Sequence, residues 1–270
     1  MLEFISGLHP VTQGLIGTAF TYLMNTLGAA MVIFTRRIRQ NWLDAMLGFA
    51  GGVMIAASAW GLLTPAFEME QESGRPVWWT IPTAFLIGGL VIWLIHTILP
   101  HAHKDADGDR VEGMSASWKR TTLLIVAITI HNIPEGIAVG VAFGAAAAGA
   151  PGASIAGAAA LALGIGIQNF PEGMAVALPL RREGMSIFRS FWYGQLSGIV
   201  EPLGGIFGAW LVFSSQAILP YALAFAAGAM IFVVLQEVVP ESQAHGNSGY
   251  ATTGGMIGFA LMMVLDLTLG

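Results

Sequence analysis

The stretch AITIHNIPEGIAVGV, residues 127–141, sets polar and helix-breaking residues inside an otherwise apolar run. A second stretch, GIGIQNFPEGMAVAL, residues 164–178, repeats this pattern with a glutamine in place of the histidine. Pro134 and Pro171 lack an N–H group, so each is expected to bend or break its helix. The sequence therefore predicts two helices that are bent at matching positions in the core.

The composition is that of a membrane protein. Of the 270 residues, 55% are hydrophobic and 10% are charged, whereas soluble domains carry about 25% charged residues. A transmembrane β-barrel would need short alternating segments instead of these long apolar runs. Because a helical span needs about 20 apolar residues, we predict an all-α polytopic membrane protein that forms one transmembrane domain over residues 1–270. The eight expected spans are residues 8–34, 43–66, 79–99, 120–144, 154–179, 187–213, 217–240 and 250–269.

Positive charge is distributed unevenly between the predicted loops. Ten of the eleven Lys and Arg residues fall on one side of the eight-span arrangement, and Arg75 is the exception. The positive-inside rule makes that side cytoplasmic, so both termini are expected outside. The ten residues are Arg36, Arg37, Arg39, Lys104, Arg110, Lys119, Arg120, Arg181, Arg182 and Arg189. The absence of Cys excludes disulfides and thiolate metal sites.

Apart from Arg120 and Arg189 at their ends, the predicted spans contain acids but no Lys or Arg. A carboxylate at mid-bilayer costs on the order of 3 kcal/mol, so acids without basic partners need another cation. For Asp266, near a helix end, we expect a structural role. The five acids are Glu135, Glu172, Glu201, Glu237 and Asp266.

The paired motifs bring potential ligands onto one helix face each. His131 and Glu135 are four residues apart and therefore lie on the same face. Because the fourth and fifth spans run antiparallel, the motifs can face each other across a pseudo-twofold axis. Imidazole, carboxylate and amide ligands without thiolate suit Zn²⁺, with Fe²⁺, Mn²⁺, Co²⁺ and Cd²⁺ as alternatives. The motif residues are His131, Asn132, Glu135, Gln168, Asn169 and Glu172.

The two motifs, the EPLGG segment at residues 201–205 and the eight spans resemble the ZIP (Zrt/Irt-like) family of divalent-metal transporters. The segments FWYGQLSGIVEPLGGIFGAW, AFAAGAMIFVV and GFALMMVLDLTLG are similar to its GufA-type branch. The resemblance implies metal transport into the cytoplasm through a two-metal centre. The first site would use Met54, His131, Glu135, Gln168 and Glu172. The second would use Asn132, Asn169 and Glu201, with Glu135 and Glu172 bridging. Asn169 stands where several relatives have an aspartate, which predicts a weaker second site.

Other polar residues fit a transport path. Met54 without the resemblance would be a packing residue. Gln236 and Glu237 precede Pro240 and are candidates for metal exit or for structural hydrogen bonding. Glu68, Glu70 and Glu72 are expected in an outer loop, as an acidic mouth or a merely solvated run, with Glu68 as the entrance candidate.

The cytoplasmic loop of residues 100–119 carries His101, His103, Asp105, Asp107 and Asp109. We expect it to be able to receive metal from the pore, although short loops of this kind often bind metal weakly. It lacks the remaining ligands of an EF-hand.

An intramembrane zinc hydrolase is the main alternative function. Zinc proteases of the HExxH type place a glutamate base beside the first histidine, whereas Asn132 occupies that position here. An amide cannot act as the base, so we expect a transporter and not an enzyme. The expected partners are divalent metal ions and the lipid bilayer, without nucleic acid. A homodimer is left open. The expected location is a bacterial inner membrane, as a multi-pass protein.

Overall fold

The computed structural model describes residues 2–35, 38–98, 101–105, 108–112, 120–182 and 184–269. The elements are helices apart from one short antiparallel hairpin, and η2 and η4 are π-helical. In chain order they are α1 (Leu2–Ser6), α2 (Pro10–Ala30), η1 (Met31–Ile33), α3 (Gln40–Ala56), η2 (Ala57–Leu63), α4 (Thr64–Glu72), α5 (Val77–Ile98), β1 (His101–Asp105), β2 (Gly108–Glu112), α6 (Arg120–Ala147), α7 (Ile155–Arg182), α8 (Ile187–Ser197), α9 (Val200–Ser214), η3 (Gln216–Ile218), α10 (Leu219–Val233), η4 (Val234–Val238), α11 (Val239–Gln243) and α12 (Ser248–Leu269).

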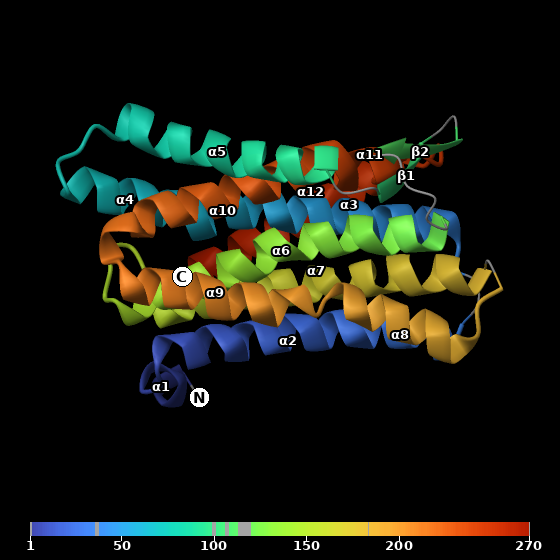
Figure 1. The fold of residues 1–270 in the computed structure, drawn as a ribbon, viewed down its shortest axis with the longest axis horizontal. Helices are drawn as coiled ribbons and strands as arrows, with labels where there is room; N and C mark the ends of the chain where they lie inside the picture. The colour runs from blue at the N-terminus through green and yellow to red at the C-terminus, as the bar shows by residue number, and fades with distance from the viewer. Residues whose placement is uncertain are drawn as a thin grey trace.

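These elements form long helical segments that run side by side (Figure 1). Among the described residues, six segments are long and apolar enough to cross a membrane. Helices α6 and α7, which carry the paired motifs, are 28 residues long each and pack among these six. Large apolar side chains are exposed on the outside of the bundle, including Leu86 and Trp93 of α5, as expected for a lipid-facing surface. The protein is therefore an all-α polytopic membrane protein.

The two chain ends lie at the same end of the bundle. Figure 1 shows the N- and C-termini on the left, with the β1–β2 hairpin on the right. The hairpin covers part of the predicted loop 100–119, and its register pairs His101 with Glu112 and His103 with Arg110. Asp107 lies outside the described residues, as do Arg36, Arg37 and Lys119. The hairpin and the chain termini thus lie at opposite ends of the bundle (Figure 1).

Glycines bring helices α3, α5, α10 and α12 into main-chain contact in two pairs, α3 with α12 and α5 with α10. A Cβ atom at Gly52 would lie 1.9 Å from the main-chain oxygen of Gly255, and one at Gly88 would lie 2.0 Å from that of Phe225. Such contacts leave no room for any side chain, which is how small residues let membrane helices approach closely. We call the segments α3–α4, α5, α10–α11 and α12 the flanking set.

The remaining segments, α2, α6, α7 and α8–α9, form the motif set, and the motif glycines hold it together. A Cβ atom at Gly136 would lie 2.4 Å from the main-chain oxygen of Glu201 in α9. In the second motif, a Cβ atom at Gly173 would lie 2.1 Å from the main-chain oxygen of Asn25 in α2. Each motif therefore packs against a different neighbour in an equivalent way.

The apolar core lies largely between the two sets. Its fully buried side chains come from both, including Met54 and Met230 of the flanking set and Leu161 and Ile165 of the motif set. A Cβ atom at Gly61 would meet Leu161 and not a main-chain atom. Side chains thus separate the sets, whereas main-chain contacts join the helices within each set.

Helices α6 and α7 run unbroken through Pro134 and Pro171. The interruptions lie elsewhere. In η2 and η4 the hydrogen bonds span five residues, as between Val239 N and Val234 O, and a proline follows each π-helical stretch. A turn separates α8 from α9, where one continuous span was predicted. These irregular stretches face the motif helices, and π-helical turns often mark functional sites.

The second segment extends to Glu72, so the prediction that Glu68, Glu70 and Glu72 lie in an outer loop is wrong. Pro65 occupies the first turn of α4, where its missing N–H costs nothing. The helix continues because the charge of Glu70 is neutralised by Arg75, just beyond its end.

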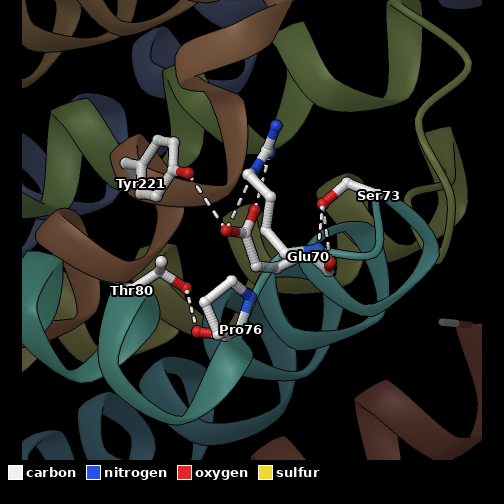
Figure 2. A network of polar contacts seen from close by, with 6 residues as sticks. Glu70, Ser73, Pro76, Thr80 and Tyr221 are labelled. Carbon is white, nitrogen blue, oxygen red and sulfur yellow. Dashed lines mark hydrogen bonds and ion pairs between the residues drawn. The ribbon is translucent and has the colours of Figure 1, made fainter.

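Glu70 is fully buried in a polar network, which Figure 2 shows, and is not part of an acidic mouth. Arg75 donates from Nε and Nη2 to the two carboxylate oxygens of Glu70, at 3.0 and 2.7 Å. Tyr221 of α10 donates from its hydroxyl at 3.0 Å. Hydrogen bonding to Glu70 raises the pKa of the Arg75 guanidinium above its usual range. The network fastens the α4–α5 connection to α10.

We expect Arg75→Ala to lower the melting temperature in detergent by roughly 5 °C or more, because it leaves the buried Glu70 carboxylate without its cation. Tryptophan fluorescence during heating measures this change. Glu72→Ala removes an exposed acid of the same helix and should leave the melting temperature unchanged. Equal effects of both substitutions would contradict the assigned role of the network.

Candidate metal-transport site

Three carboxyl groups from three helices of the motif set are buried in the interior. Glu135 lies in α6, Glu172 in α7 and Glu201 in the first turn of α9, with exposed fractions of 0%, 6% and 0%. Two contacts connect these helices, because Asn169 of α7 donates to Glu201 and Gly136, next to Glu135, packs on the main chain of Glu201. Among the described residues, no Lys or Arg side chain pairs with any of them. The interior therefore holds three buried acidic groups whose ionised form needs a cation.

The neighbouring amides form a hydrogen-bonded chain. Gln168 donates from Nε2 to Asn169 Oδ1 at 2.7 Å, and Asn169 donates from Nδ2 to Glu201 Oε2 at 2.7 Å. Asn132 donates from Nδ2 to the main-chain oxygen of Ser197 at 2.9 Å. Asn169 is thus occupied on both sides, as an acceptor from Gln168 and as a donor to Glu201.

Several oxygens at this site are buried without a hydrogen-bond donor in the described part of the chain. Each unpaired buried group costs about 1–3 kcal/mol, so the site is built for a partner that supplies positive charge. Carboxylate and amide oxygens in this number suit a divalent cation. The oxygens are Asn132 Oδ1, both of Glu135, Gln168 Oε1, Glu172 Oε2 and Glu201 Oε1.

His131 is placed differently from the predicted ligand set. Its Nε2 contacts Glu237 Oε2 of η4, and the other oxygen of Glu237 lies 2.8 Å from His96 Nε2 of α5. All three side chains are largely buried. Sequence reasoning missed His96, although a single histidine inside an apolar span is a recognised functional signal. Glu237, one of the two candidates for metal exit, therefore links both histidines.

Met54 lies in α3 and is fully buried within the main apolar core. The site is not preassembled around a metal. Over the described ranges, no three His, Asp or Glu side chains are grouped closely enough to hold a metal ion. The structure therefore brings together the acids and amides of the motifs, and leaves His131 with Glu237.

A cavity of about 420 Å³ opens at the bundle end that carries the termini. Glu68 and Asp266 line it, together with Thr64 and Ser154. Its inner wall includes Ala158 of α7, and Gln168 lies ten residues further along that helix, or about 15 Å at 1.5 Å per residue. The buried side chains of Leu161 and Ile165 lie on the helix between them.

Comparison with known proteins agrees with this architecture. The family profile described as ZIP Zinc transporter matches residues 100–266. The zinc transporter ZIP11 of Bos taurus is 40% identical, over 98% of this chain and 100% of that protein. The zinc transporter GufA of Myxococcus xanthus is 37% identical, over 95% and 99% of the two chains. The zinc transporter ZIPB of Bordetella bronchiseptica is 37% identical, over 96% of this chain and 82% of that protein. The buried acids thus lie in a chain with the family's sequence along nearly its whole length, and the chain belongs to the ZIP zinc transporter family.

Proposed function

We propose that this chain moves divalent transition-metal cations across a membrane into the cytoplasm, through the carboxylate site between α6 and α7. Zn²⁺ is the main substrate, and Cd²⁺, Fe²⁺, Mn²⁺ and Co²⁺ are further substrates. The observation that carries this proposal is the burial of Glu135, Glu172 and Glu201 in the interior without a Lys or Arg partner in the described structure. Family membership supports transport and gives no support to a zinc hydrolase.

The transported cation is held first by Glu135 and Glu172, with Gln168 Oε1 as a neutral ligand. These atoms are buried and lack donors among the described residues. We expect the cation to replace Glu237 as the partner of His131, which then completes the site together with the thioether of Met54. Metal binding thereby replaces the contact of the His131 imidazole with Glu237 by a bond to the cation.

The path begins at the cavity beside Glu68 and Asp266, whose negative charges raise the local concentration of dications. Glu68 is the entrance residue. Asp266, expected to be purely structural, lines the same cavity. On the other side, Glu237 receives the cation between His131 and His96. The hairpin residues His101 and His103 belong to the same end of the bundle (Figure 1), where they can take up the released metal.

A second metal site, formed by Asn132, Asn169 and Glu201 with Glu135 and Glu172 bridging, has low occupancy by dications. Its weakness follows from Asn169, whose oxygen already accepts from Gln168 and whose nitrogen donates to Glu201. An aspartate in that position would add a carboxylate ligand. The Asn169 amide instead occupies Glu201 Oε2 with a hydrogen bond. The binuclear centre is therefore only partly developed in this chain.

The chain crosses the membrane eight times, in a bacterial inner membrane, with both termini outside and a homodimer as the candidate assembly. The bundle ends support this arrangement, because Arg181, Arg182 and the hairpin lie opposite the termini (Figure 1).

A cysteine substitution scan tests the orientation. A cysteine at Arg182 should be shielded from an impermeant thiol reagent in intact cells, whereas one at the exposed Glu72 should be labelled. The native chain has no Cys, so the parent protein gives no background labelling. Labelling of the Arg182 variant from outside, before the cells are permeabilised, would reverse the orientation.

The function is tested by zinc flux into liposomes that contain only this chain, measured with an entrapped zinc-sensitive dye. We expect saturable uptake that Cd²⁺ inhibits by competition. Peptide and lipid cleavage are measured in parallel on the detergent-solubilised protein. Cleavage without flux would favour the hydrolase and overturn the transport proposal.

A further inference from the structure

An apolar stretch separates the outer cavity from the metal-transport site. Asp266 and Ala158 line the cavity, and Gln168 lies ten residues beyond Ala158 along α7. Between them, Leu161 and Ile165 fill the interior with fully buried aliphatic side chains. A cation that has left water is costly to place among such side chains, because they offer it no lone pair. Passage inward therefore requires a heteroatom on the way.

Met262 of α12 brings a sulfur atom into this stretch. Its side chain is fully buried in the same apolar core. A Cβ atom at Gly164 of α7 would lie 2.4 Å from Met262 Sδ. The sulfur thus occupies the space that a side chain at Gly164 would take, and it lies against the backbone of α7.

The level of this sulfur follows from the two helices that meet there. Gln168 lies four residues after Gly164 in α7, and Asp266 lies four residues after Met262 in α12. Residues four apart share a helix face and are about 6 Å apart along the axis. Ala158 shares the cavity with Asp266, and Gly164 meets Met262, so the two helices run in opposite directions. Met262 Sδ therefore lies about one turn inside the cavity acid and about one turn outside Gln168.

A second thioether, that of Met54 in α3, lies deeper. Gly52 and Gly255 are in main-chain contact, and both α3 and α12 run toward the bundle end that carries the termini (Figure 1). Met54 lies two residues beyond Gly52, and Met262 lies seven residues beyond Gly255. Met262 is therefore about five residues, or about 7.5 Å, further outward than Met54. The two sulfurs follow each other along the path, so Met262 belongs to the approach and Met54 to the proposed metal site.

Thioether chemistry discriminates between dications. Sulfur ligands favour soft and borderline metals such as Cd²⁺ and Zn²⁺, whereas Mn²⁺ and Mg²⁺ prefer oxygen. A thioether carries no charge, so it can hold a passing cation without trapping it. Packing alone is the other role that a buried Met can have, because its flexible side chain fills irregular gaps in cores. The two roles differ in one measurable respect, since only a ligand distinguishes one metal from another.

We propose that Met262 Sδ is a transit ligand, which the cation contacts between the outer cavity and the site of Glu135 and Glu172. At this step the thioether favours soft over hard dications. The inference rests on the proposed transport function and adds a selective step on the outer side of the metal site. Gly164 is the matching positioning residue, because any side chain there would displace the sulfur from the face of α7 that carries Gln168.

Met262→Leu tests the ligand role, because leucine nearly preserves the volume of methionine and removes the sulfur. Uptake of Cd²⁺ and of Mn²⁺ into proteoliposomes is measured by elemental analysis of the washed vesicles. We expect Cd²⁺ uptake to fall roughly five-fold or more and Mn²⁺ uptake to stay within about two-fold of the parent. Gly164→Ala should lower the ratio of the two rates in the same direction. Met263→Leu makes the same exchange at the next residue, which is partly exposed, and should keep the parental ratio.

Met262→Cys tests whether the position lies on the path, and the parent has no Cys that could react. Hg²⁺ added outside should abolish zinc uptake by this variant, and a dithiol should restore it. Excess Zn²⁺ should slow the block, because both ions enter by the same route. Met263→Cys is the control and should keep its zinc uptake in Hg²⁺.

Equal losses of Cd²⁺ and Mn²⁺ uptake in Met262→Leu would reduce Met262 to a packing residue and overturn the proposal. Parental rates for both metals in that variant would overturn it as well, as would a Met262→Cys protein that Hg²⁺ does not block. Each of these results leaves the transport function intact. Failure of the parent to take up any dication would instead overturn the transport function itself.

Discussion

Glu172→Ala is expected to reduce zinc uptake by at least about 100-fold. The substitution removes a buried carboxylate that belongs to both proposed metal sites, and loss of even an outer-shell partner of a metal costs 10–100-fold. Initial rates in proteoliposomes with matched amounts of protein measure the effect. The folded state should survive, because Glu172 Oε2 makes no hydrogen bond in the described structure that the change could remove.

Glu72→Ala serves as the matched control, since it removes a glutamate that is exposed and remote from the site. It should transport zinc at the rate of the parent. If Glu172→Ala retains more than about a tenth of the parental rate, the Glu172 carboxylate does not take part in transport.

Asn169→Asp is expected to make folding depend on bound metal. The parent Asn169 donates to Glu201 Oε2 at 2.7 Å, so the new carboxylate faces another one at hydrogen-bond distance. Leaving such a buried charge without a partner costs about 3 kcal/mol or more. In the presence of EDTA the melting temperature should therefore fall by roughly 10 °C, and excess Mn²⁺ should restore it.

The same variant should bind two dications per chain where the parent binds one, because a fourth carboxylate completes the second site. Elemental analysis of the purified protein gives this stoichiometry. Asn169→Ser, which removes the amide without adding charge, is the control and should stay at one dication. An Asn169→Asp protein with unchanged stoichiometry and no stabilisation by Mn²⁺ would refute the assignment of the second site.

The sequence predicts the helical segments well because apolar runs and breakers act locally. The segment α6 begins at Arg120 and the segment α8–α9 begins at Ile187, both as expected. The predicted end of the second span at residue 66 was wrong, because three acids and a proline suggested that a loop begins there. Only the distant Tyr221 and the neighbouring Arg75 make it favourable for Glu70 to be buried in a helix.

The irregular elements could not be predicted in the same way. The helices α6 and α7 continue through Pro134 and Pro171, whereas the turn after Ser197 and the π-helical stretches were not anticipated. Where a helix opens depends on which side chains from other helices take up the freed carbonyls. At Ser197 that partner is Asn132, 65 residues away in the chain.

The acids and amides of the site follow from the repeated motif, whose spacing sets Glu135 and Glu172 on facing helices. The positions of His131 and Glu237 do not follow from it, because their contact joins residues 106 apart. His96 was missed because it is the only ionisable residue of its apolar run and belongs to no repeat. A search for isolated ionisable residues inside spans would have found it.

The most direct test of the account is the position of the metal in the zinc-loaded protein, determined by anomalous scattering at the zinc absorption edge. The account predicts a peak between α6 and α7, about 2.0–2.2 Å from carboxylate oxygens of Glu135 and Glu172. A zinc peak found only at the hairpin histidines His101 and His103, with none between the motif helices, would contradict it.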